Sequence, residues 1–261
     1  MSHSVQRVQL ARAYVLHQRP FRDSSLIVEA FTRDYGRLTL FAHGARGPRS
    51  RFTALQPFRA LLLSWSGRGE APTLSAAEPA APAASGVSAV PDGAAGRLPA
   101  ARLMSGFYLN ELLLKLLTRQ DPYPGLFDQY EATLGQLCSS PEGESEVPLR
   151  LFEARLLEFI GYGLNLAAEA DTGHPVRPEA YYRFQPGVHG FVVAEPASPG
   201  AIAGHVLHGL AAGSAPSGEG QLRQARALMR AALDHCLEGR ELATRTVARS
   251  LAAYPHKERR A

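Results

Sequence analysis

The stretch GRLTLFAHGARGPRSRFTALQPF, residues 36–58, changes from strand to basic loop and back to an apolar pattern within one short window. The composition of residues 37–42 predicts a strand, and Gly44, Gly47 and Pro48 then interrupt any regular element. The loop carries three guanidinium groups, those of Arg46, Arg49 and Arg51. A solvated turn is the plain interpretation of such a charge run, and a site for an anionic ligand is the functional one.

The length of 261 residues leaves room for two domains, since single domains usually hold roughly 100–200 residues. The net charge of +4 hides a segregation along the chain. Residues 1–80 hold 11 basic and 5 acidic side chains, residues 81–220 hold 8 and 15, and residues 221–261 hold 9 and 4. Basic ends around an acidic middle favour a polyanionic partner such as a nucleic acid.

Short strands dominate the first 80 residues. They are expected at residues 9–16, 26–32, 37–42 and 58–65, with a turn at Arg19-Pro20 and a fifth strand near Thr73. This count predicts a five-stranded barrel of the oligonucleotide-binding (OB-fold) type, which binds single strands through a basic groove with aromatic stacking platforms. The candidate platforms are Tyr35, Phe41, Phe52, Phe58 and Trp65. We expect most of these rings to fill the barrel interior and at most one or two to be exposed.

An Ala/Pro/Gly-rich segment follows the predicted barrel. We assign residues 81–99 to a linker or insertion that separates an OB-fold domain, residues 1–80, from a mainly helical domain, residues 100–261. Apolar residues at helical spacing predict helices near residues 103–117, 126–137, 148–160, 222–236 and 242–251. Residues 170–200 are rich in Pro and Gly and predict loops with a small hairpin. The fold class is therefore α+β with two domains.

No motif for enzymatic chemistry is recognisable. The sequence lacks a phosphate-cradling loop, a nucleophile elbow and a zinc-protease motif. Cys138 and Cys236 have no ligand spacing and are expected to be buried thiols. His205 and His208 lie three residues apart without a third ligand in register, so ordinary histidines are the expectation. Neither a signal peptide nor a membrane span is predicted, and we expect a cytoplasmic, non-enzymatic protein without cofactors.

Four stretches together resemble the RecO family of bacterial DNA repair and recombination mediators. They are GRLTLFAHGARGPRSRF, LQPF at residues 55–58, SGFYLNELLLKLL at residues 105–117 and LRLFEARLLEFIGYGLNL at residues 149–166. The resemblance implies binding of single- and double-stranded DNA, annealing of single strands, and location at the nucleoid. It also implies cooperation with RecR in loading RecA onto DNA coated by single-stranded DNA-binding protein. The alternative is a helical adaptor that binds only protein partners.

Two groups of arginines are the candidate site residues. We expect Arg37, Arg46, Arg49 and Arg51 to contact DNA phosphates, because guanidinium groups neutralise backbone charge without reading bases. Arg223, Arg226 and Arg230 recur at helical spacing beside an apolar seam. The resemblance implies that this stripe, joined by Arg150, binds the acidic, phenylalanine-ended tail of single-stranded DNA-binding protein. Arg223→Ala and Arg150→Ala are expected to weaken tail binding.

The sequence departs from the family at one place. Many members carry a four-cysteine zinc site after the G-Y-x-L-N-L motif, whereas the segment that follows Leu166 here contains no cysteine until Cys236. Zinc is therefore not expected, and Glu169, Asp171 and His174 are poor replacement ligands for a structural site. We expect packing to hold this segment instead. Its aromatic anchors would be Tyr181, Tyr182, Phe184 and Phe191.

Overall fold

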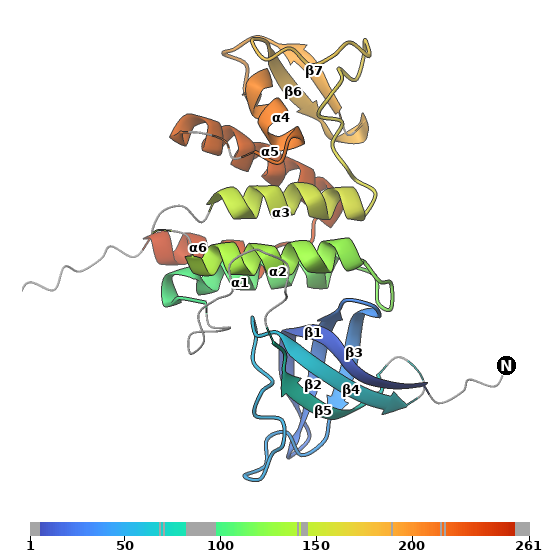
Figure 1. Cartoon of the computed structure of the whole chain (residues 1–261). Coiled ribbons are helices and arrows are strands. Elements are labelled where there is room, and N and C mark those ends of the chain that lie inside the picture. The colour runs from blue at the N-terminus through green and yellow to red at the C-terminus, as the bar shows by residue number, and fades with distance from the viewer. Residues whose placement is uncertain are drawn as a thin grey trace, which may run out of the picture.

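The structure is a computed structural model that describes residues 6–67, 69, 71–81, 98–139, 141, 146–188, 190–214, 216 and 218–253. Figure 1 shows a β-barrel at one end, layers of helices in the middle and a small sheet at the other end. The predicted α+β, two-domain class is confirmed. Most of the predicted linker, residues 82–97, lies outside the described residues, so its limits stay a prediction.

The N-terminal strands close into a barrel in the order β1-β2-β3-β5-β4. The strands are β1 (Gln6–Phe21), β2 (Ser25–Thr32), β3 (Gly36–Ala42), β4 (Leu61–Gly67) and β5 (Thr73–Pro79). The neighbouring strands pair antiparallel except β3 and β5, which pair parallel. Closure leaves no long free edge, and the strand count and order are those of an OB-fold. The prediction of a five-stranded barrel is confirmed.

Two strand limits differ from the sequence-based prediction. β1 runs through Arg19 and Pro20 and turns only after Phe21, so the turn predicted at Arg19-Pro20 is wrong. Proline is tolerated there because this part of β1 pairs with β2 along one edge only. The fourth strand begins at Leu61 rather than at Phe58, because Phe58 has a left-handed backbone with φ of 65° that no regular strand accepts.

The pleat sends alternate side chains of each strand to opposite faces of the barrel wall. In β3 every second residue, including Leu38 and Leu40, points into the barrel, whereas Arg37 and Phe41 point outward. Phe52 and Trp65 fill the barrel core, as expected for rings in a barrel of this size. Phe41 is only half-buried on the outer face, so it remains available as a platform for a nucleobase.

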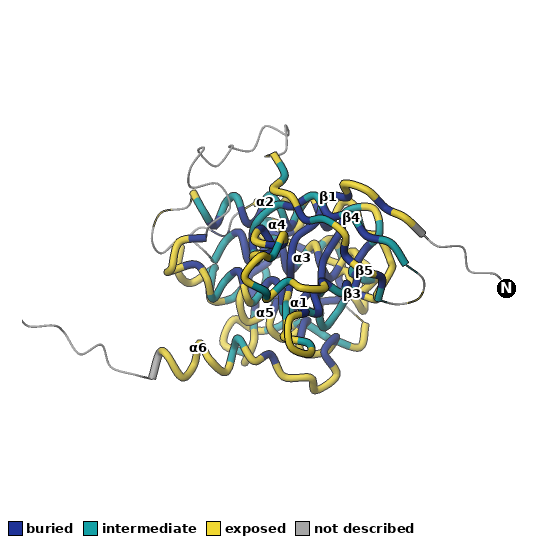
Figure 2. Tube along the Cα trace, turned by 90° about the horizontal axis from the view of Figure 1, so that it is seen from below, coloured by how far each residue is buried: buried dark blue, intermediate teal, exposed yellow. Residues whose placement is uncertain are grey.

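The second domain is mainly helical, as predicted. Its helices are α1 (Leu103–Leu116), α2 (Pro124–Ser139), α3 (Glu146–Phe159), α4 (Gly204–Ala211), α5 (Glu219–Leu237) and α6 (Ala243–Ala253), with short 3₁₀ turns at Ala100–Arg102 and Pro186–Val188. The predicted hairpin is the pair β6 (Tyr181–Gln185) and β7 (Gly190–Ala194), extended to a three-stranded sheet by β8 (Ala201–Ala203). Tyr182 and Phe191 are fully buried anchors of this sheet, as expected. Figure 2 shows α6 at the periphery with a mainly exposed surface.

The barrel and the helices share one hydrophobic core. The side chains of Tyr14, Leu16 and Phe31 project from the outer face of β1 and β2 and pack into the hydrophobic core formed with α1, α2 and α3. The centroid of the Phe31 ring lies 5.4 Å from that of Phe127 and 6.1 Å from that of Tyr130, both on α2. Burial of several aromatic rings at one junction contributes strongly to holding the two domains together.

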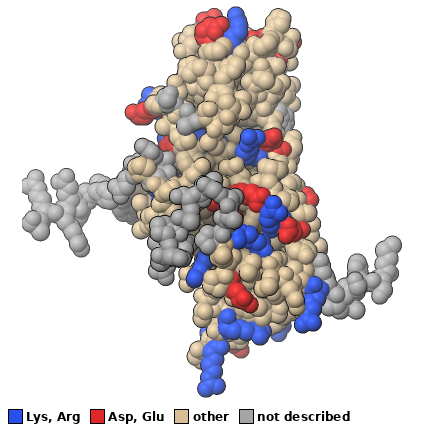
Figure 3. Space-filling model, viewed as in Figure 1, with Lys and Arg blue, Asp and Glu red and all other residues tan. Residues whose placement is uncertain are grey.

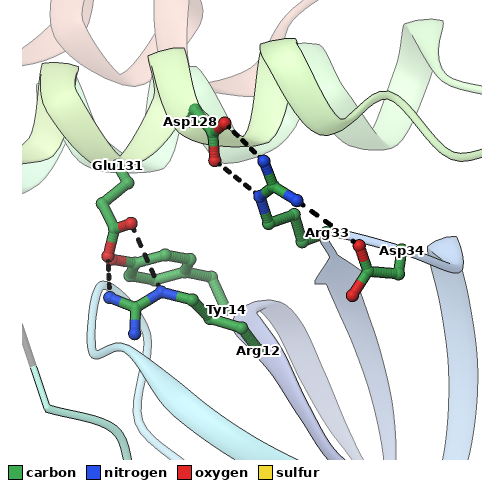
Figure 4. A network of polar contacts seen from close by, with 6 residues as sticks. All are labelled: Arg12, Tyr14, Arg33, Asp34, Asp128 and Glu131. Carbon is green, nitrogen blue, oxygen red and sulfur yellow. Dashed lines mark hydrogen bonds and ion pairs between the residues drawn. The ribbon is translucent and has the colours of Figure 1, made fainter. Parts of the chain in front are cut away.

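Polar contacts surround that aromatic junction (Figure 4). Arg12 pairs with Glu131 on α2, and the Tyr14 hydroxyl donates to the same carboxylate at 2.8 Å. Arg33 donates two parallel hydrogen bonds, both of 2.9 Å, to Asp128, which lies one turn before Glu131 on α2. Burial, together with Glu131, raises the pKa of the Tyr14 hydroxyl, which therefore stays a donor at neutral pH. These contacts fix the angle at which the barrel meets α2.

A third contact requires a glycine. Gly36 begins β3 with φ of 68°, and a Cβ added there would lie 2.1 Å from the carbonyl oxygen of Asp121 in the α1–α2 connection. The neighbouring backbone is joined by a hydrogen bond of 2.9 Å from the Gln120 N–H to the Arg37 carbonyl. Only glycine permits this close approach of barrel and helical domain.

Candidate functional site

The loop between β3 and β4 presents the predicted arginines at the barrel end farthest from the helices. Arg46, Arg49 and Arg51 are exposed there, and Figure 3 shows basic side chains gathered at this end. The loop is anchored on both sides. Near its start, the Arg46 N–H donates a hydrogen bond of 2.8 Å to the Ser24 carbonyl in the β1–β2 turn. At its end, Phe52 is buried in the barrel core.

The charges of these three side chains are not neutralised within the described part of the chain. No described carboxylate forms an ion pair with Arg46, Arg49 or Arg51, whereas Arg12, Arg33 and Arg37 each have one. Arg51 instead lies over the Phe52 ring, with its guanidinium carbon 5.1 Å from the ring centroid. We call these three residues the arginine loop. It can accept an anionic ligand without first breaking an internal ion pair.

The structure does not bring Arg37 to the arginine loop. Its guanidinium is mostly buried, donates to Glu29 at 3.1 Å and makes two bonds of 3.2 and 3.0 Å to the Leu117 carbonyl at the end of α1. Burial lowers the pKa of this guanidinium, an effect that Glu29 partly offsets. Arg37 thus joins the domains, and we leave it out of the proposed DNA contacts.

A pocket of about 270 Å³ lies between α1, α3, α5 and α6. It brings together three of the four arginines predicted for tail binding, Arg150, Arg226 and Arg230, and adds Arg245 from α6. The rest of its lining is Met104, Ser105, Tyr108, Leu149, Glu153, Thr244 and Ala248. An apolar floor beside several guanidinium groups suits an anionic ligand with one hydrophobic end.

The most enclosed polar group in the pocket is the carboxyl of Glu153, whose side chain is 1% exposed. One oxygen, Oε1, accepts from the Tyr108 hydroxyl at 2.6 Å and from Arg150 at 2.7 Å. Among the described residues, Glu153 Oε2 and Arg150 Nε have no hydrogen-bond partner. Burial raises the pKa of the Glu153 carboxyl, although Arg150 and Tyr108 counteract the shift. Buried polar atoms without partners are uncommon and mark places where a ligand can complete the bonding.

The arginines at the pocket rim form more exposed ion pairs than Arg150 does. Arg226 is half-exposed and pairs with Glu146, and Arg230 lies 3.8 Å from Asp234. Arg223, one turn earlier on α5, is exposed, pairs with Glu219 at 2.8 Å and does not line the pocket. The helical stripe predicted from the sequence is therefore split: its two later members face the pocket and its first member does not.

Sequence reasoning missed Tyr108, Glu153 and Arg245, because they reach the pocket only through helix packing. α6 is held against α1 by Glu111, which accepts from the Ala243 and Thr244 N–H groups at 2.8 and 2.9 Å and so caps α6. No local pattern reports this contact between residues more than 130 positions apart. The apolar spacing of residues 242–251 predicted the helix, but it carried no signal for this contact, since the described residues of α6 are half-buried or exposed.

In the part of the chain that the structure describes, no three His, Cys, Asp or Glu side chains are grouped as a metal site would require. His208 donates to the Val176 carbonyl at 2.7 Å, and Glu169 accepts from Thr172 and from Tyr182. Within the same residues, no helix combines the length and the apolar composition that crossing a lipid bilayer requires.

Comparison with known proteins agrees with this arrangement. Residues 7–83 match the family model "Recombination protein O N terminal", and residues 99–246 match "Recombination protein O C terminal". The "DNA repair protein RecO" of Alkalilimnicola ehrlichii is 45% identical over 252 residues, which cover 95% of this chain and 94% of that protein. The protein of the same name from Methylococcus capsulatus is 43% identical over 248 residues, 94% of either chain. That of Laribacter hongkongensis is 38% identical over 254 residues, 95% of this chain and 96% of that protein.

Proposed function

Because the chain belongs to the RecO family of DNA repair proteins, we propose that it is a non-enzymatic recombination mediator that binds single-stranded DNA through the arginine loop. In this role it also binds double-stranded DNA, anneals complementary single strands, and acts at the nucleoid. With RecR it loads RecA onto DNA coated by single-stranded DNA-binding protein. The pocket between α1, α3, α5 and α6 holds the acidic tail of that coating protein.

The absence of ion pairs at the arginine loop, among the described residues, carries the DNA-binding part of the proposal. Three exposed guanidinium groups on one anchored loop produce a local positive field, and no described carboxylate forms an ion pair with them. Phosphates neutralise such a field, and the counterions released from the DNA provide the driving force. Because guanidinium groups that contact phosphates neutralise backbone charge without reading base edges, binding should depend little on sequence.

A salt titration tests this part. For single strands the logarithm of the affinity changes by about 0.7 per neutralised phosphate for each tenfold change in salt. Replacing Arg46, Arg49 and Arg51 by alanine should therefore lower the slope by about 2 and weaken binding about a hundredfold at 0.1 M salt. Arg183→Ala is the control, since Arg183 is exposed in the small sheet at the other end of the molecule. An unchanged slope in the folded triple variant would remove the arginine loop from the site.

The pocket supports the tail-binding part. Arg226 and Arg230 at its rim can bind carboxylates, and Met104, Leu149 and Ala248 offer an apolar surface to a terminal phenylalanine ring. A volume of about 270 Å³ is just below the range typical of sites for drug-sized ligands, which suits the end of a peptide. Binding energy should come mainly from the buried ring and one or two arginines, since exposed ion pairs contribute about 1 kcal/mol or less.

Fluorescence anisotropy with a labelled acidic peptide that ends in phenylalanine tests the pocket. Arg226→Ala and Arg230→Ala should weaken peptide binding several-fold and leave binding to an oligonucleotide unchanged. Arg223→Ala is the matched control on the same helix, because its side chain lies outside the pocket lining. Equal losses in all three variants would show that the peptide reads only general positive charge. Peptide binding without any DNA binding by the wild type would support the adaptor alternative.

A further inference from the structure

Three rings form a cluster on the outer face of the barrel that the core does not use. The centroids of Phe21 at the end of β1 and Phe41 on β3 lie 5.4 Å apart, and the His43 ring lies nearly parallel to Phe41, at 14° and 6.4 Å. Phe21 and Phe41 are half-buried, and His43 is exposed. Ile27 of β2 pairs in register with Phe41 and is buried.

The pleat explains why these rings face outward. Leu40 and Ala42, on either side of Phe41, are fully buried in the barrel core, so Phe41 must point to the opposite face. The core is already filled by other side chains, including Trp65 and Leu74. The ring cluster therefore offers part of its aromatic surface to a partner outside the barrel.

Positive charge borders the rings. The Arg22 guanidinium carbon lies 5.2 Å from the centroid of the Phe21 ring, and Arg46 of the arginine loop donates to the Arg22 carbonyl at 3.5 Å. Arg19 is exposed on the same strand. Of the nearby acidic groups, Asp23 is exposed at the turn, and Glu29 is occupied by Arg37 and Arg119.

Cationic groups beside open aromatic rings match the chemistry of a single strand, which carries phosphates and unpaired bases. Stacking on aromatic side chains tolerates any base, because every base has a π-face. In OB-folds the face of strands 2 and 3 and the loop between strands 1 and 2 are the surfaces that bind oligonucleotides. Phe41 lies on that face and Arg22 in that loop.

We propose that Phe21, Phe41 and His43 form a base-stacking platform that takes unpaired bases of single-stranded DNA, while Arg22 and Arg46 hold the adjoining phosphates. This inference rests on the proposed DNA-binding function and adds the element that distinguishes single strands from duplex. Paired bases cannot reach the rings, so a duplex is held by its phosphates alone.

The test uses Phe41→Leu and His43→Ala in the full-length protein. Leucine keeps apolar volume over Ile27 but removes the ring, and His43 is exposed, so both variants should fold. Affinity for an oligothymidine should fall about fivefold to a hundredfold in Phe41→Leu and less in His43→Ala. Affinity for a duplex should stay unchanged. Phe107→Leu is the control, since Phe107 is a partly exposed ring of the helical domain that packs against Phe58.

Two further readouts separate this proposal from that of the arginine loop. Phe41→Leu should leave the salt slope unchanged because no phosphate contact is lost, whereas the triple arginine variant should flatten it. The wild type should bind an oligothymidine more tightly than an abasic strand of equal length, and Phe41→Leu should abolish that difference. Wild-type behaviour of Phe41→Leu in both readouts, with loss of binding in the triple arginine variant, would overturn the platform alone. Failure of the wild type to bind single strands would overturn the proposed function itself.

Discussion

The outer face of β1, β2 and β3 has two ends with the same residue types and opposite surroundings. At the end near the helices, Tyr14 and Phe31 are buried and Arg37 is paired with Glu29. At the far end, Phe41 is half-exposed and the arginine loop has no carboxylate partner among the described residues. Aromatic rings and guanidinium groups thus join domains at one end and are free for a ligand at the other. Partners, rather than residue type, separate a structural arginine from a binding arginine.

The largest effect should follow from breaking the joined end. Glu131→Ala removes the acceptor of the buried Tyr14 hydroxyl and the charge partner of Arg12, which keeps only its hydrogen bond of 2.9 Å to the Ala81 carbonyl. We expect a loss of about 3 kcal/mol in the free energy of unfolding, toward the lower limit for broken buried pairs because both charged side chains keep some exposure. Urea denaturation measures it. A change below about 0.5 kcal/mol would mean that the aromatic core alone fixes the domains.

A pH-dependent effect on the free energy of unfolding is expected at the pocket between α1, α3, α5 and α6. Burial raises the pKa of Glu153 in the folded state, with Tyr108, Arg150, Arg245 and Glu146 as its charged or titratable neighbours. Its contribution to stability is therefore complete below the unfolded-state pKa of about 4.3 and is lost as the pH rises through the folded-state pKa. Glu153→Gln cannot titrate. The free energy of unfolding of the wild type minus that of the variant should decrease as the pH rises above about 4.

Urea denaturation at several pH values checks this prediction. The control is Glu158→Gln, because Glu158 is on the same helix but 60% exposed in its pair with Arg155. The wild type minus this control should change little with pH. An increase of the Glu153 difference with rising pH would show instead that Arg150 dominates the carboxyl and that its pKa is lowered.

A smaller effect is expected at the edge of the junction. Asp128→Asn weakens the bidentate contact with Arg33, but both side chains are about half-exposed, at 52% and 42%. Water screens such pairs, so we expect a loss of about 1 kcal/mol or less in the free energy of unfolding. Thermal and urea denaturation of Asp128→Asn and Glu131→Ala, measured in parallel, would compare the two losses of stability. Equal losses in the two variants would remove the distinction between the core and the edge of the junction.

The smallest stability effect is predicted for the arginine loop. Replacing Arg46, Arg49 and Arg51 by alanine should change the free energy of unfolding by no more than about 0.5 kcal/mol, since no ion pair to a described carboxylate is lost. The same variant should lose most DNA affinity. Arg37→Ala is the variant for comparison. It should destabilise the protein and leave the salt slope of DNA binding unchanged. A destabilised loop variant would place these arginines in the structural class.

Elements whose causes are local could be predicted from the order of the amino acids. The strand-like composition of residues 37–42, the break at Gly44 and the helical spacing of apolar residues after residue 100 correctly predicted the barrel, the basic loop and the helical domain. Strand limits were predicted less accurately because they depend on single backbone conformations, such as the left-handed Phe58. The motifs also indicated the family before any contact between elements was known.

The surroundings of each arginine, in contrast, depend on contacts between distant parts of the chain. Arg37 and Arg49 look alike in the sequence, yet one meets the end of α1 and the other meets solvent. Arg226 and Arg245 are far enough apart in sequence that only the packing of α5 and α6 brings them to one pocket. Periodicity records which face of an element is buried, because that depends on neighbours along the chain. It does not record which distant carboxylate or ring that face will meet, because that depends on how the elements pack.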